Sequence, residues 1–212
     1  MNTLFLTALL LSPMISPNPA VQDTLDDLNL HIVAGGNMGG EVTDAGPEFG
    51  MKVEYLLLHP IVVRLAGSYT FAEIKGTGVP DGDKRTLDAA LETFVYRGRG
   101  DYFIYLGIGI VRSFNSFRPD AFKDFSFGNR EIDTLLIDGR LSGIGLDNGW
   151  GYRAVFGGRY KEKYSLEMGL QTTWSDFVFR IEHPDENLPG IAVFRASKLS
   201  TVWITIGYII SL

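Results

Sequence analysis

The stretch TVWITIGYIISL, residues 201 to 212, alternates between two sets of side chains. One set is Val202, Ile204, Ile206, Tyr208, Ile210 and Leu212. The other set is Thr201, Trp203, Thr205, Gly207, Ile209 and Ser211. Successive side chains of a strand point to opposite faces, so a period of two over a dozen residues predicts a β-strand. This strand has one strongly apolar face, and the partner of that face has to be explained.

The same alternation returns along the rest of the chain, and no run has the spacing of a helix. In 48–58, for example, Phe49 and Met51 alternate with Glu48 and Lys52. The predicted strands are 28–36, 48–58, 61–72, 86–96, 101–113, 151–160, 164–174 and 201–212.

The connections between these runs alternate in length. Short turns are predicted at 58–60, 97–100 and 161–163, and long polar loops at 37–47, 73–85, 114–150 and 175–199. Short turns at one end and long loops at the other are typical of an up-and-down antiparallel meander. With eight strands, both termini fall at the short-turn end.

Composition limits the class of protein. A chain of 212 residues fits one domain, and none of its segments has the run of about 18 apolar residues that a membrane-spanning helix needs. A net charge of −6 argues against a nucleic-acid partner, which requires a dense basic surface. The chain has no cysteine, which excludes disulfides, thiolate catalysis and cysteine-bound metals.

The N-terminal segment differs from the rest. The short apolar run TLFLTALLLSPMI (3–15) precedes the breaker stretch SPNPA and the acidic VQDTLDD. This order predicts a secretory signal peptide over 1–20, cleaved after Ala20, followed by a barrel domain over 21–212. A buried N-terminal helix is the alternative.

The two faces of the strands suggest which one meets water. Small and charged residues suit the narrow interior of an eight-stranded barrel, whereas bulky aliphatics flanked by aromatics suit lipid. Strands of about ten residues also match a tilted membrane span.

We interpret the charged residues on the interior face as a salt-bridge network that fills the lumen, with pore lining or an active site as alternatives. Its members are Glu48, Lys52, Glu54, Arg64, Asp88, Glu92, Arg153, Arg159 and Glu167.

Aromatic residues near the strand ends predict two interfacial girdles. The girdle at the short-turn end comprises Tyr102, Tyr160, Tyr164 and Tyr208. The girdle at the loop end comprises Tyr69, Phe71, Tyr152 and Trp174.

With its signal-like start, eight alternating strands and apolar final strand, the chain resembles the small eight-stranded outer-membrane β-barrels of Gram-negative bacteria, the OmpA/OmpX/OmpW-like group. The resemblance implies periplasmic termini, four external loops, and outer-membrane lipid and the barrel-assembly machinery as partners. It also implies that Tyr208, Ile210 and Leu212 form the C-terminal assembly signal. In that family the last strand ends in an aromatic residue, and here it ends in Leu212.

Three sharper motifs carry less information. Arg99-Gly100-Asp101 spells an adhesion tripeptide, but it falls in a predicted periplasmic turn. Residues 143–148 nearly match a dinucleotide fingerprint without its strand-to-helix context, so we interpret them as loop. His31, His59 and His183 lie far apart in the predicted topology, which argues against a triad or a metal cluster. A pairing of His183 with Ser175 or Asp176 is the catalytic alternative to a solvated loop histidine.

The sequence therefore predicts an all-β, eight-stranded antiparallel up-and-down transmembrane β-barrel. We expect no enzymatic activity, cofactor or metal, and a structural or surface-interaction role carried by the long loops. One alternative is a narrow channel or binding site for a small hydrophobic molecule, as in some OmpW-like proteins. Another is a soluble lipocalin-like carrier, which would need no detergent for extraction.

Overall fold

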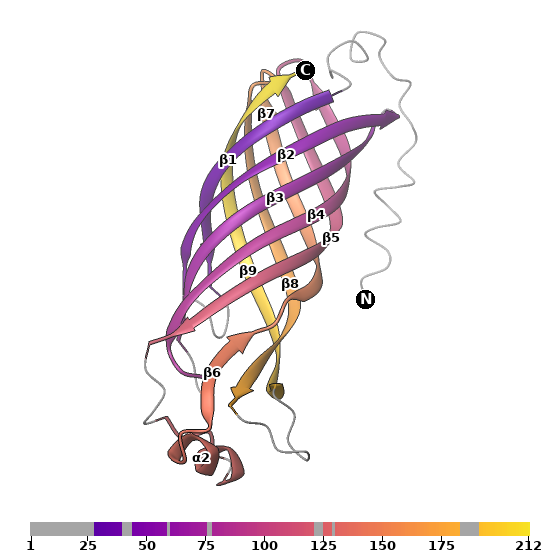
Figure 1. The fold of residues 1–212 in the computed structure, drawn as a ribbon. Helices are drawn as coiled ribbons and strands as arrows, with labels where there is room; N and C mark the ends of the chain where they lie inside the picture. Colours follow the sequence, from indigo (N-terminus) through magenta and orange to yellow (C-terminus); the bar gives the residue numbers. More distant parts are fainter. Residues whose placement is uncertain are drawn as a thin grey trace, which may run out of the picture.

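The chain folds into a closed ring of eight antiparallel strands (Figure 1). The computed structural model describes residues 28–39, 44–58, 60–75, 78–120, 125–128, 130–182 and 191–212. Each strand of the ring pairs with its neighbours along the chain, which confirms the predicted up-and-down barrel. The ring consists of β1 (Leu28–Met38), β2 (Gly46–Leu58), β3 (Ile61–Ile74), β4 (Gly82–Arg99), β5 (Tyr102–Pro119), β7 (Gly149–Tyr160), β8 (Tyr164–Ile181) and β9 (Ile191–Ser211). A short strand, β6 (Leu141–Leu146), and a helix, α2 (Arg130–Ile137), lie between β5 and β7.

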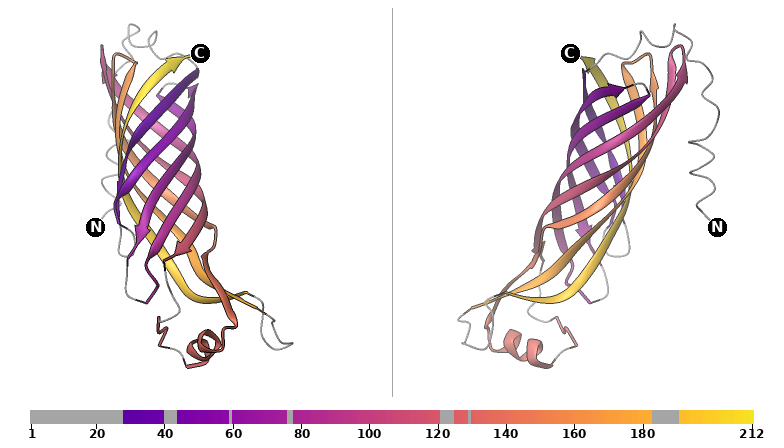
Figure 2. Two further views of the ribbon diagram at one scale, coloured as in Figure 1. Left: turned by 60° about the vertical axis from the view of Figure 1, so that its left-hand side comes forward. Right: turned by 90° about the vertical axis from the view of Figure 1, so that its right-hand side faces the viewer.

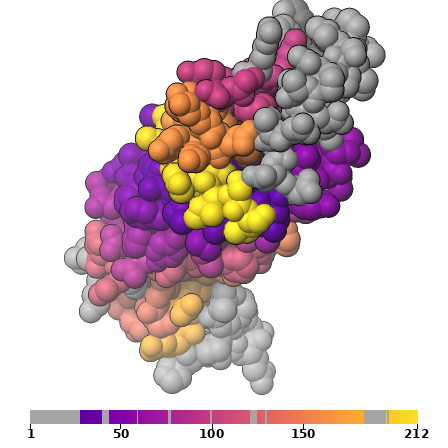
Figure 3. All heavy atoms as spheres, turned by 90° about the horizontal axis from the view of Figure 1, so that it is seen from above, coloured from indigo at the N-terminus to yellow at the C-terminus, as the bar shows by residue number. Residues whose placement is uncertain are grey.

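The final strand closes the ring. β9 pairs with β1 from Asn29↔Ser211 to Met38↔Val202, and with β8 on its other side. At the short-turn end, the C-terminal residues of β9 (yellow) lie between β1 (indigo) and the β7–β8 hairpin (orange) in Figure 3. Both described ends of the chain therefore lie at the short-turn end.

The short turns use residues with left-handed backbone. Lys161 and Glu162, between β7 and β8, have φ angles of 50° and 57°, and Gly100, after β4, has a φ of 62°. Such angles suit glycine best and cost other residues some strain, which tight turns commonly accept. His59, in the predicted turn at 58–60, lies outside the described residues.

The strands extend well beyond the predicted length of about ten residues. β4, β5 and β8 each have 18 residues and β9 has 21, so parts of the predicted loops 73–85, 114–150 and 175–199 are strand. Outward positions near the loop end carry charges such as Asp83, Arg85 and Arg118, so the apolar alternation stops there. Backbone pairing continues regardless, because it does not depend on an apolar outer face.

β6 prolongs the barrel wall beyond the start of β7, and the prediction of a loop over 143–148 was wrong for residues 143–146. It pairs with β8 from Leu141↔Ile181 to Leu146↔Phe177, on the same side of β8 as β7. Asn115 of β5 secures the break between β6 and β7. Its Nδ2 donates to the Asp147 carbonyl and to Ser175 Oγ, and its backbone N–H donates to Asn148 Oδ1.

The loop end, which lies at the bottom of both views in Figure 2, carries its own apolar cluster. Buried side chains from the ends of β3, β5, β8 and β9 and from Val79, before β4, meet those of β6, and α2 packs Ile132, Leu135 and Leu136 against them. Within the described residues, the connection between β5 and β7 therefore contains folded structure. None of the helices in the described ranges is both long and apolar enough to cross a membrane. The predicted signal peptide, 1–20, lies outside these ranges.

Candidate functional site

All nine charged residues that the alternation assigns to the interior are buried in the barrel. They alternate with outward-facing neighbours on their strands, and none exceeds 6% exposure. The set is Glu48, Lys52, Glu54, Arg64, Asp88, Glu92, Arg153, Arg159 and Glu167.

Arg64, on β3, lies at the centre of this network with no exposed surface. Its Nε donates to Glu92 Oε2 over 2.5 Å, and its Nη1 donates to Glu167 Oε1 over 2.6 Å and to Glu54 Oε1 over 3.3 Å. The guanidinium also lies 4.1 Å from the centroid of the Phe94 ring. One arginine therefore bridges three carboxylates from β2, β4 and β8, which uses the forked donor geometry that lysine lacks.

The second arginine, Arg159, lies nearer the short-turn end and pairs with Glu54. Its Nη2 is 3.1 Å from Nε2 of His31, and because arginine can only donate, the histidine nitrogen accepts. The Tyr96 hydroxyl donates a hydrogen bond to Glu54 Oε2, with 3.1 Å between the two oxygens. Glu54 is thus held from β4 and β7 in addition to its contact with Arg64.

The network continues toward the loop end around a tryptophan. Lys52 donates to Glu167, and Arg153 Nε lies 3.3 Å from Glu92 Oε1. Both cations lie close to the ring of Trp203, at 5.0 and 4.8 Å from its centroid. The aromatic face therefore stabilises cations that have lost their water.

The buried charges balance within the described part of the chain. Five cations (Lys52, Arg64, Lys84, Arg153 and Arg159) face five carboxylates (Glu48, Glu54, Asp88, Glu92 and Glu167). Balanced charge suits a dry, filled lumen, since an isolated buried ion costs several kcal/mol.

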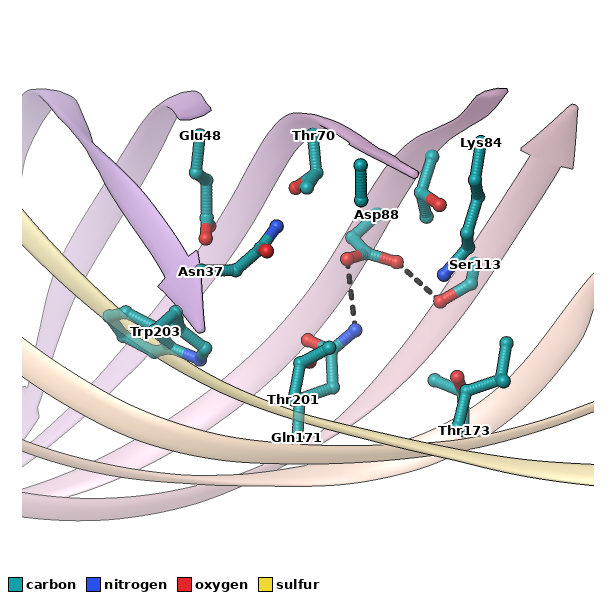
Figure 4. Close-up of a pocket in the computed structure, with 13 residues that line it drawn as sticks. Asn37, Glu48, Thr70, Lys84, Asp88, Ser113, Gln171, Thr173, Thr201 and Trp203 are labelled. Atoms are coloured by element: carbon teal, nitrogen blue, oxygen red, sulfur yellow. Dashed lines mark hydrogen bonds between the residues drawn. The ribbon is translucent and has the colours of Figure 1, made fainter. Parts of the chain in front are cut away.

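Asp88 lies apart from the arginines of the network. It accepts hydrogen bonds from Ser113 and from Gln171, the latter at 2.9 Å (Figure 4). Around it is a polar cavity of about 30 Å³, bordered also by Glu48 and Lys84. A water molecule needs roughly 10–15 Å³ of such space, so the cavity has room for only a few waters.

Glycines create the space for the interior aromatic rings. Gly107 is the cross-strand partner of Phe94, and Gly169 is the partner of Trp203. A Cβ on either glycine would overlap the opposite ring, and Gly157 has the same relation to Tyr105. Absence of a side chain on one strand therefore lets a ring from the next strand fill the lumen.

We expect Gly107→Ala to lower the free energy of unfolding by about 1–3 kcal/mol, because the Phe94 ring would have to leave its rotamer. Gly143→Ala is the matched control, since nothing lies within 4 Å of its added Cβ. Urea unfolding of the refolded protein in detergent micelles measures both. Equal stability of the two variants would mean that Phe94 does not depend on this space.

Sequence reasoning missed several members of the interior set. His31 alternates with the outward Ile32, and Tyr105 shares its face with Gly107. The two-residue period of the strands could therefore have placed both side chains in the interior. Tyr105 donates to Glu167 Oε1 over 2.6 Å. Lys84 was missed because it falls in a segment predicted as loop, and Tyr96 because it ends a predicted strand.

The outer surface has an aliphatic belt between two aromatic rows. Leu65, Leu106, Ile108 and Ile206 are 45–72% exposed in the belt. At the short-turn end Tyr102 contacts Tyr160, with ring centroids 5.0 Å apart, and Tyr164 contacts Tyr208, at 5.8 Å. At the loop end Tyr69 contacts Phe71 at 4.7 Å, and Tyr152 contacts Trp174 at 5.0 Å. The loop-end row also includes Phe49, Phe114 and Trp150, which the sequence interpretation did not include.

The catalytic alternative cannot be assembled from the described residues. Ser175 is buried in β8 and bonded to Asn115, and His183 lies outside the described ranges. Within these ranges, no three His, Asp or Glu side chains are placed to hold a metal ion.

Comparison with known proteins identifies the fold. No protein-family model and no curated protein matches the sequence. Outer membrane protein OprG from Pseudomonas aeruginosa is similar in structure, with a TM-score of 0.51 and 15% identity over 88% of this chain and 98% of that chain. Neisserial surface protein A is similar too, with a TM-score of 0.51 and 10% identity over 87% of this chain and 96% of that chain. The chain therefore has the fold of the small eight-stranded outer-membrane β-barrels.

Proposed function

We propose that this barrel is closed to solutes, and that its structural or surface-interaction role is carried by the folded segments at the loop end. The observation that carries the proposal is the bridging of three carboxylates by Arg64 at full burial. These contacts join β2, β3, β4 and β8 across the lumen. An eight-stranded barrel has an interior that side chains can fill, and here they do so with balanced charge.

A lumen of this kind leaves little space for a bound molecule. The polar cavity beside Asp88 measures about 30 Å³, whereas pockets for small molecules have volumes of roughly 300–1,000 Å³. Its border of carboxylates, amides and hydroxyls also disfavours an apolar ligand. The interior therefore supports a plug better than a binding site for a hydrophobic molecule.

The loop end supports the second half of the proposal. β6, α2 and the extended ends of β8 and β9 form a structured projection beyond the aromatic row, and Ile137 on α2 is 83% exposed. Rigid elements that carry exposed side chains are suited to contact a partner. We assign the partner contacts of the protein to this projection, and we propose no catalytic step.

Assembly would use the opposite end. We propose that Tyr208, Ile210 and Leu212 serve as the recognition signal for the assembly machinery. Their side chains lie on the outer face of β9 and are 37–69% exposed, so they remain accessible until lipid covers them.

The orientation is tested with a protease added to intact cells. We expect cleavage within 114–150 or 175–199 and none at the β4–β5 turn near Arg97, because that turn would face the periplasm. The same protease added to permeabilised cells is the control that the turn can be cut. Cleavage near Arg97 in sealed cells would reverse the orientation and would remove the external role of the projection.

A further inference from the structure

A row of cations and tryptophans crosses the outer surface at the loop end of the aliphatic belt. Its members are Arg112 on β5, Trp150 on β7, Trp174 on β8 and Lys198 on β9. The strand register places them directly beside one another, because Arg112 pairs with Trp150, Trp150 with Trp174, and Trp174 with Lys198. All four occupy outward positions, so two cations flank two indole rings on the lipid side.

Arg112 and Trp150 contact each other within this row. The guanidinium of Arg112 lies 4.9 Å from the centroid of the Trp150 ring and 5.8 Å from that of Phe114. Trp150 and Trp174 are 59% and 46% exposed. Since neighbouring strands lie about 4.8 Å apart, the row from Arg112 to Lys198 spans about 14 Å. Such a span matches the headgroup of one or two lipids.

The two cations lack a negative partner. Neither Arg112 nor Lys198 forms an ion pair with any carboxylate in the part of the chain that the structure describes. Lys75, also at the loop end, instead pairs with Glu73 and lies 3.0 Å from Asp44, and these carboxylates raise its pKa above the ordinary lysine value. A cation at the edge of hydrocarbon is costly unless an anion approaches it. Among the described residues, therefore, none supplies the anion that this row of cations favours.

We propose that Arg112, Trp150, Trp174 and Lys198 form a binding site for the phosphate groups of lipid headgroups in the leaflet at the loop end. Indole rings prefer the membrane interface, where one side of the ring is apolar and the N–H meets polar groups. Each basic side chain near a membrane surface favours an anionic lipid by roughly fivefold. A lipid fits the row better than a free phosphate ion, because the rings between the two cations face acyl chains.

The test measures quenching of tryptophan fluorescence by brominated lipids in vesicles that contain the full-length barrel. Trp203 is 2% exposed inside the barrel, so the quenching reports on Trp150 and Trp174. We expect brominated phosphatidic acid to quench as if it bound at least fivefold more tightly than brominated phosphatidylcholine. Arg112→Gln combined with Lys198→Gln should bring the ratio of the two apparent lipid affinities close to one.

The matched control is Lys75→Gln combined with Arg97→Gln, which removes the same net charge away from the row and should keep the wild-type ratio. A wild-type ratio near one would overturn the proposal, as would an unchanged ratio in the Arg112/Lys198 variant. Inorganic phosphate at 10 mM should leave the ratio unchanged, and full competition by it would show a general anion site instead of a lipid site. None of these outcomes depends on whether the lumen is closed.

Discussion

Replacing Arg64 with methionine is expected to lower the free energy of unfolding by about 3–5 kcal/mol. The substitution leaves Glu54, Glu92 and Glu167 without the cation they share, at a depth where these carboxylates are at most 1% exposed. An unpaired charge in such a site keeps its desolvation cost and loses the compensating attraction. Urea titration of the barrel refolded in detergent micelles measures the change.

Second substitutions locate the origin of the loss. Adding Glu167→Gln to Arg64→Met should restore part of the stability, because it removes the carboxylate charge that the loss of Arg64 leaves in excess of the buried cations. Arg118→Met, on an exposed outward position of β5, should be nearly silent. Arg153→Ala should lie between these results, since it removes the contacts with Glu92 and with the Trp203 ring, and Glu92→Gln should partly compensate for it. If Arg64→Met were as stable as the wild type, the network would contribute little to holding the strands together.

An arginine in the aliphatic belt is expected to be costly as well. Leu106→Arg or Ile206→Arg should lower the free energy of unfolding in lipid vesicles by about 2–4 kcal/mol, because each moves a charge into hydrocarbon near the middle of the bilayer. Both leucine and isoleucine side chains point outward, at 45% and 66% exposure. The loss in free energy of unfolding should be smaller when the same variants are unfolded from small micelles, because water lies nearer to the substituted side chain there.

Ile137→Arg is the matched control for the belt. Ile137 is an apolar side chain of 83% exposure on α2, beyond the loop-end aromatic row. The change to arginine there should alter stability by less than about 0.5 kcal/mol. Equal losses at Leu106 and Ile137 would show that the belt does not contact lipid.

The sequence was sufficient for the architecture because a barrel strand in lipid repeats one rule at every second residue. The alternation identified all eight strands of the ring and the inward face of each one. It failed where lipid no longer imposes that rule. β6 has buried Leu141 and Ile144 spaced by three residues, and α2 is only a short helix that depends on its contacts with the apolar cluster.

The sequence predicted which residues face the interior of the barrel, but it did not predict which of them pair with one another. Alternation alone places Arg64, Glu92 and Glu167 inside, but which carboxylate meets which arginine depends on the stagger between strands. That stagger puts Asp88 beside Gln171, out of reach of the arginines. The aromatic filling was also hidden, since Phe94 and Trp203 reach inward only because Gly107 and Gly169 lie opposite.

The central claim, a closed lumen, is tested most directly by recording ion current through the purified wild-type barrel in planar lipid bilayers. On the proposed closure, a network with five cations and five carboxylates and a cavity of about 30 Å³ would leave no continuous aqueous path. We expect no steady conductance from the wild type, with rare brief openings at most. A stable open channel in the same preparation, once shown by heat-modifiable migration to be folded, would contradict the account.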